Sequence, residues 1–102
     1  SGSELFSADL SYAFLREANL SSTILFSANL FSANLFNANL RGATLNNAYL
    51  NNANLSNANL HLADLHGAIL RDVNVEGAKF GQGLGLSETT KQDLIAKGAI
   101  FN

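Results

Sequence analysis

Residues 28–60 read ANLFSANLFNANLRGATLNNAYLNNANLSNANL, and this stretch decides the fold because a leucine returns at every fifth position. The same period extends in both directions, from Leu5 to Leu70 without a miss, and Val75 and Phe80 continue it. We call these residues the centres of the repeat. The residue two places before a centre is small, and it is Ala in all but three cases: Ser3, Thr23 and Val73.

A period of five fits neither an α-helix nor a flat strand. At about 100° per residue, five helical residues advance by about 500°, so successive leucines would circle the helix without forming a stripe. In a long strand they would alternate between the two faces. The pattern is satisfied if the chain turns a corner once in five residues. Four such corners close a coil of about 20 residues, and each residue then stacks on the one a full coil away.

The sequence therefore predicts an all-β solenoid with the centres and the small residues facing inward. An interior this narrow has room for one large and one small side chain on each side of the coil. The predicted structural core consists of Leu10, Leu15, Leu20, Leu25, Leu30, Leu35, Leu40, Leu45, Leu50, Leu55, Leu60, Leu65, Leu70 and Phe80.

Polar residues predominate at the positions that face solvent or form the corners. Glycines fall two places after a centre at Gly42, Gly67 and Gly77, where a turn can require a positive φ. Asn or Asp is favoured one place before the centre. Some of these asparagines recur at intervals of 20, so we expect ladders of stacked amides and turn hydrogen bonds from two sets: Asn19, Asn39 and Asn59; Asn34, Asn54 and Asn74.

Units such as Ala28-Asn29-Leu30 and Ala58-Asn59-Leu60 resemble the A(D/N)LXX motif of the pentapeptide-repeat family. The resemblance covers about residues 3–82 and implies a right-handed quadrilateral β-helix of about four 20-residue coils. Similarity to cyanobacterial-type members implies a cyanobacterial or plastid origin. Cytoplasm and thylakoid lumen or periplasm are then the alternative locations.

The repeat ends after Phe80, and the remainder predicts a short C-terminal helix that caps the solenoid. The expected division is residues 1–82 as the repeat domain and 83–102 as linker and capping helix. Ser87 suits the N-cap of a helix over about 88–97, and Gly98 suits its C′ position. Five residues should give this end its apolar side: Leu86, Leu94, Ile95, Ile100 and Phe101.

No comparable cap precedes Leu5 and Leu10. The sequence begins Ser1-Gly2-Ser3 without a Met, which suggests a trimmed chain from which any targeting segment has been removed. Two explanations stay open for the first coil: a capping segment has been lost, or this edge contacts another chain.

Charge and composition argue against several classes of function. Charged residues make up 14% of the chain and the net charge is −2, too mild to indicate nucleic acid or anionic membrane as a partner. There is no Cys, and no apolar run approaches the roughly 20 residues of a membrane helix. His61 and His66 should point outward, with Asp64 as the one nearby ligand type. We therefore predict no catalytic, cofactor, metal or small-molecule site.

Four phenylalanines directly follow centres and should point outward: Phe6, Phe26, Phe31 and Phe36. Phe6 should stack beneath Phe26, and Arg16 beneath Phe36 as a cation–π pair. Exposed contiguous aromatic surface usually marks an interface. Each ring could equally lie flat on its neighbours, so a partner surface and local packing are both open readings.

The leading hypothesis is a non-catalytic structural or protein-interaction module whose partner is itself or another protein. The alternative comes from the resemblance: quinolone-resistance members mimic DNA and bind DNA gyrase or topoisomerase. Six acidic and four basic side chains in the repeats make a poor imitation of duplex DNA, which carries a charge about every 1.7 Å.

Overall fold

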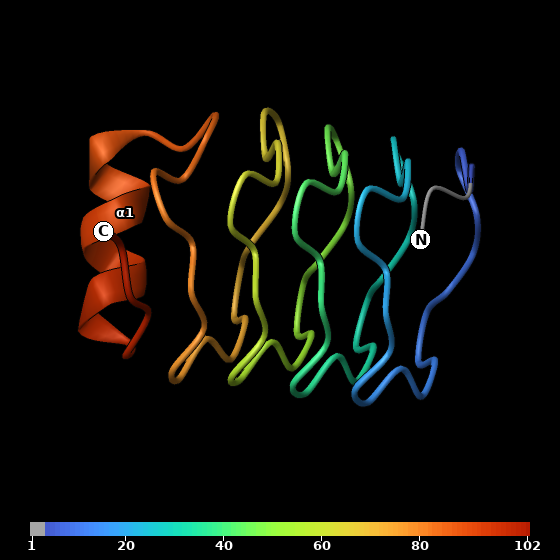
Figure 1. The fold of residues 1–102 in the computed structure, drawn as a ribbon, viewed down its shortest axis with the longest axis horizontal. Coiled ribbons are helices and arrows are strands. Elements are labelled where there is room, and N and C mark those ends of the chain that lie inside the picture. Colours follow the sequence, from blue (N-terminus) through green and yellow to red (C-terminus); the bar gives the residue numbers. More distant parts are fainter. Residues whose placement is uncertain (1–3) are drawn as a thin grey trace.

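In the computed structural model, which describes residues 4–102, the chain winds into a stack of similar coils, with the first described coil and the C-terminus at opposite ends (Figure 1). Parallel β-bridges join residues 20 positions apart, beginning with Glu4 and Ile24 and continuing to Asp64 and Leu84. Five residues form each side, so four sides complete a turn. Ser3, the first predicted inward residue, lies outside the described residues.

Each side is held to the next coil by a repeating set of backbone hydrogen bonds. The Leu30 N–H donates to the Tyr49 carbonyl at 2.7 Å, and the Tyr49 N–H donates to the Ala28 carbonyl at 2.9 Å. The corner is closed within the coil, where the Ala33 N–H donates to the Leu30 carbonyl at 3.0 Å. One side therefore satisfies its backbone by pairing along the stack and turning at its own end.

The corners require a left-handed residue two places after every centre from Leu5 to Val75. The predicted positive φ at Gly42, Gly67 and Gly77 is confirmed, with values of 69–72°. The twelve other residues at this position are not glycine, yet their φ lies between 52° and 64°. An L-residue pays roughly 1–2 kcal/mol for this conformation. The inter-coil ladder therefore overrides local preference at each corner, even where the residue is Leu62.

The favoured Asn or Asp before each centre has a different role from the predicted ladder. In all nine cases its Oδ1 accepts a hydrogen bond from the backbone N–H two residues later, at 3.0–3.2 Å. Asn39 and Asn59 do lie one above the other. However, no hydrogen bond joins two of these amides within residues 4–102. The expected turn hydrogen bonds are therefore confirmed, whereas the expected amide ladders are wrong, because the local turn already occupies the side-chain oxygen.

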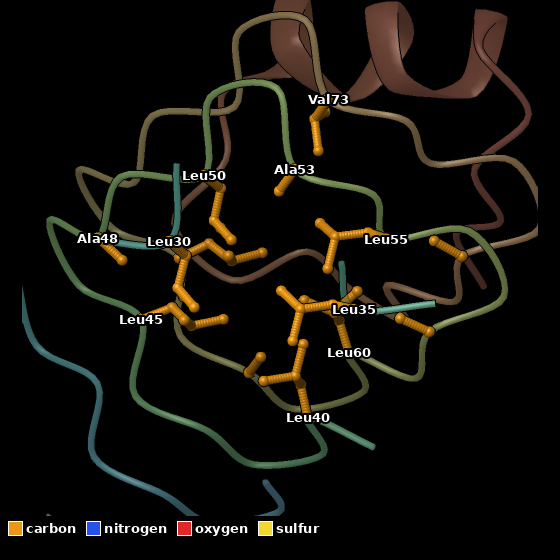
Figure 2. Close-up of a cluster of buried hydrophobic side chains, with 14 of the residues drawn as sticks. Leu30, Leu35, Leu40, Leu45, Ala48, Leu50, Ala53, Leu55, Leu60 and Val73 are labelled. Atoms are coloured by element: carbon orange, nitrogen blue, oxygen red, sulfur yellow. The ribbon is translucent and has the colours of Figure 1, made fainter. Parts of the chain in front are cut away.

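The core runs along the axis of the stack, where leucines from all four sides converge (Figure 2). The centres from Leu25 to Leu65 are 0–1% exposed, as are Val75 and Phe80. Ala fills the space between them on each side. Leu10, Leu15 and Leu20 belong to the first coil and are only partly buried, and so is Leu70 near the other end.

The predicted C-terminal helix is confirmed as α1, Glu88–Ala96, which lies across the end of the stack (Figure 1). The Ser87 side chain accepts a hydrogen bond from the Thr90 N–H, as expected of an N-cap. Gly98 has a φ of 100° and donates to the Ile95 carbonyl, while Ala99 donates to the Leu94 carbonyl. These two bonds are a Schellman motif, with Gly98 at C′.

The expected apolar side of α1 is partly wrong. Leu94 is buried, but Ile95 is 44% and Ile100 is 42% exposed. Ile100 instead pairs with Lys79, and the Phe101 ring stacks on Phe80 with centroids 5.0 Å apart. Residues 99–101 thus form one more side of the solenoid, because they repeat the order small residue, outward residue, apolar residue.

Residues 83–85 lead from the repeats into α1 and also pair with the coil below. The Leu65 N–H donates to the Leu84 carbonyl, so coil pairing continues two residues past position 82. Gly85 has a φ of 87°, and a Cβ placed on it would lie 2.4 Å from the His66 backbone nitrogen. Gly42, also left-handed, has nothing nearer to such a Cβ than the Ser22 Oγ at 3.4 Å. Only glycine fits at position 85 without moving the cap.

A matched pair of substitutions separates the cost of a left-handed backbone from the cost of a Cβ that clashes with a neighbouring backbone. Gly42→Ala should lower the free energy of unfolding by about 1 kcal/mol, the cost of left-handed backbone alone. Gly85→Ala adds a backbone clash and should cost at least about 2 kcal/mol. Urea unfolding followed by circular dichroism measures both. Equal losses would contradict the close packing of residues 83–85 on the coil below.

Candidate interaction surface

The aromatic surface, defined as Phe6, Phe26, Phe31 and Phe36, follows the corners of the first two coils. Phe6 and Phe26 stack as expected, with ring centroids 6.4 Å apart and planes tilted by 57°. Phe6 is 59% and Phe26 is 41% exposed. This pair therefore leaves large apolar area in water even after the two rings have packed on each other.

The other two rings are covered by neighbours. The Arg16 guanidinium lies 4.7 Å from the centroid of the Phe36 ring, so the expected cation–π contact is confirmed. Tyr12 meets Phe31 edge to face with centroids 5.6 Å apart. Both phenylalanines are half-buried. Contacts with neighbouring side chains thus cover much of the Phe31 and Phe36 rings, whereas they cover less of the Phe6 and Phe26 rings.

The sequence analysis did not assign two further exposed aromatic residues to this region. Phe14 is 92% exposed and occupies an outward position usually held by Asn. Tyr12 is 66% exposed despite its contact with Phe31. The sequence could have revealed them, because both aromatic residues occupy positions of the repeat that face outward. The described part of the first coil therefore presents Phe6, Tyr12 and Phe14 together with half-buried leucines.

The two histidines point outward and make local contacts. The His61 Nδ1 lies 3.1 Å from the Asn59 Oδ1, and the His66 Nδ1 lies 2.5 Å from the Asp64 Oδ1. The hydrogen bond from the His66 side chain holds the pKa of the Asp64 carboxyl below its usual range; burial opposes this shift, and the His66 backbone N–H supports it. The pair is exposed on a corner.

No cluster of three His, Asp or Glu side chains able to hold a metal ion occurs between residues 4 and 102. Within the same span, no helix is long and apolar enough to cross a membrane. In the described part of the first two coils, the exposed large apolar side chains are all aromatic: Phe6, Tyr12, Phe14 and Phe26.

The Asp64 contact predicts a pH dependence. Because the pKa is lowered by folding, the stabilisation is fully present above the ordinary Asp pKa near 4 and is lost as the pH falls through the lower, folded value. Its size should be at most about 1 kcal/mol, since the pair is exposed. Asp64→Asn should flatten the acid limb of the stability profile below about pH 4. An unchanged profile in urea unfolding would contradict the assignment.

The comparisons with known proteins agree with this geometry. The family model of pentapeptide repeats matches residues 3–42 and 33–72. The crystal structure of Rfr23, a pentapeptide repeat protein from the cyanobacterium Cyanothece 51142, is 44% identical over 74% of this chain, with a TM-score of 0.73. The chain spans about half of that protein, 51% of its length.

A plant structure is similar over almost the whole chain. A pentapeptide repeat protein from the Arabidopsis thaliana thylakoid lumen is 31% identical over 97% of this chain and 73% of its own, with a TM-score of 0.71. No curated protein sequence matches. Repeat, bridge pattern and relatives agree: the chain belongs to the pentapeptide-repeat family, whose members are right-handed β-helices and in general structural proteins rather than enzymes.

Proposed function

We propose that this chain is a non-catalytic structural and protein-interaction module. It is a body of about four 20-residue coils over residues 1–82, closed by residues 83–102. The observation that carries the proposal is the exposed pair Phe6 and Phe26, whose apolar area lies in water at one end of the stack. The partner is a second copy or another protein that buries these rings.

A filled interior supports the absence of catalysis. The core leucines and alanines occupy the axis of the coil, so its interior, as far as residues 4–82 show, has no enclosed space in which titratable groups could converge on a substrate. The acidic and basic groups that the body carries are on outward positions. A net charge of −2 likewise gives little support to imitation of duplex DNA.

The relative from the Arabidopsis thylakoid lumen supports a lumenal location as one proposal, beside the cyanobacterial cytoplasm or periplasm. Interaction through a non-catalytic surface is compatible with each of these compartments. Location therefore leaves the proposed role unchanged and decides only which partners the module meets.

Replacing Phe6 and Phe26 by Ser should weaken association at least about tenfold, because two exposed rings no longer contribute to the interface. Light scattering over a concentration series measures self-association. For a different partner, the proteins retained by the immobilised chain are compared between wild type and variant. Leu62→Ser is the matched control, since Leu62 is also 59% exposed but lies on another corner.

Both variants should keep the melting temperature close to that of the wild type, since the replaced side chains are exposed. If Phe6→Ser with Phe26→Ser left both the solution mass and the set of retained proteins unchanged, the aromatic surface would have no role in association. An equal loss in Leu62→Ser would show that the effect is nonspecific and would also count against the proposal.

A further inference from the structure

The coil beneath α1 is covered unequally on its four sides. Residues 83–85 pair with the side at 63–65, and residues 99–101 pair with the side at 78–80. The two sides between them, at 68–70 and 73–75, have no strand above them in the described part of the chain. The helix α1 lies over this end instead (Figure 1), and a helix cannot complete a β-ladder because its backbone N–H and C=O groups point along its own axis.

The side at 68–72 consequently keeps unpaired backbone groups. One coil below, the Leu50 N–H donates to the Ile69 carbonyl and the Asn52 N–H donates to the Arg71 carbonyl. The corresponding donors one coil later are the N–H groups of Leu70 and Asp72, and neither has a protein partner within residues 4–102. The Ala68 carbonyl, which should accept from a further strand, is also free of backbone partners there.

The same side also leaves core residues uncovered. From Leu25 to Phe80, the inward small and central residues are buried except at Ala68 and Leu70, which are half-exposed. On the neighbouring side Val73 and Val75 are buried, together with Leu94 of α1. The cap therefore buries the core residues of one strandless side and leaves those of the other half-exposed.

An open groove of about 600 Å³ occupies this position. Its walls are the edge at 68–72 and, opposite, Leu86, Thr90 and Leu94. Charged residues of both signs line it as well, Arg71 and Lys97 against Asp72 and Asp93, so its charge is balanced. The groove combines an apolar surface, a strand edge and a helix wall, the elements of a site for strand addition.

We propose that this groove binds an extended peptide segment of a partner protein, which pairs in parallel with residues 68–72 as an added strand. Two N–H donors and one carbonyl acceptor at ladder spacing specify an extended backbone rather than a helix or a small molecule. The chain itself shows the side chains that fit. A small residue stacks on Ala68, an outward residue follows, and an apolar residue stacks on Leu70, as Ala48, Tyr49 and Leu50 do on residues 28–30.

The groove lies beneath α1, at the end of the stack opposite to the aromatic surface. Its occupancy therefore does not depend on the proposed role of Phe6 and Phe26. The Phe6→Ser, Phe26→Ser variant should bind the peptide as the wild type does, which keeps the two proposals separately testable.

The probe is a fluorescent, terminally blocked peptide with the sequence of residues 46–52, because residues 48–52 stack on residues 28–32 as the bound strand would stack on residues 68–72. Fluorescence anisotropy measures its affinity for the full chain. Amide hydrogen exchange locates it, and added peptide should protect the amides of Leu70 and Asp72. A peptide N-methylated at the residue copied from Tyr49 lacks the donor to the Ala68 carbonyl and should bind about tenfold more weakly.

Two substitutions on α1 test the location. Asp93→Trp fills the groove and should weaken binding at least about tenfold. Gln92→Trp is the matched control, because both residues are exposed, both contact a side chain one turn away and only Asp93 lines the groove. The Gln92→Trp variant should bind the peptide as tightly as the wild type does.

Saturable binding with protection at Leu70 and Asp72, lost in Asp93→Trp and kept in Gln92→Trp, is the expected result. Absence of binding up to the solubility limit would overturn the proposal. So would protection confined to the first coil, or equal affinities in the two tryptophan variants. Protection of Leu70 and Asp72 that grows with protein concentration alone would assign the groove to a second copy and would also overturn it.

Discussion

The five-residue corner is the constraint on which the structure depends. A left-handed residue two places after each centre from Leu5 to Val75 turns the chain into the next side, and at nine corners an Asn or Asp before the centre accepts a backbone N–H, as Asn54 does from Ser56. With one corner per five residues, each residue lies beside the residue 20 positions later, and the inter-coil ladder can form. The leucine core, in turn, exists because the corners bring every centre to the same axis.

The ladder between coils also explains where the protein has surfaces available for binding. In the middle of the stack, neighbouring coils cover the leucine core and pair most backbone groups, so the surface there consists mainly of polar turns with single apolar side chains such as Leu62. At the two ends the repeat has no further coil among the described residues. The aromatic surface gathers near one end, and at the other the cap completes two sides with short strands and covers a third with Leu94. Features available for binding are therefore those that the repeat cannot satisfy itself.

Much of the fold is predictable because a strict period leaves few solutions. The spacing of leucines predicts the coil, and Ser87 and Gly98 predict the bounds of α1 to within a residue. Local preference failed where tertiary pairing overrides it: Leu62 adopts a left-handed φ of 64° that its side chain disfavours. The role of Ile100 was missed because residues 99–101 follow a helix and stand outside the five-residue register. The groove could not be predicted, since it depends on which sides α1 covers.

Amide hydrogen exchange, residue by residue, tests the corner and ladder most directly. In the middle of the stack the amides of Leu45, Asn47, Ala48 and Tyr49 all donate to backbone carbonyls, whereas the Asn46 amide has no such partner. The account predicts strong protection with one fast amide in every five residues, slowed where an Asn or Asp precedes the centre, as at Ser56. Uniform protection, or a period other than five, would contradict it.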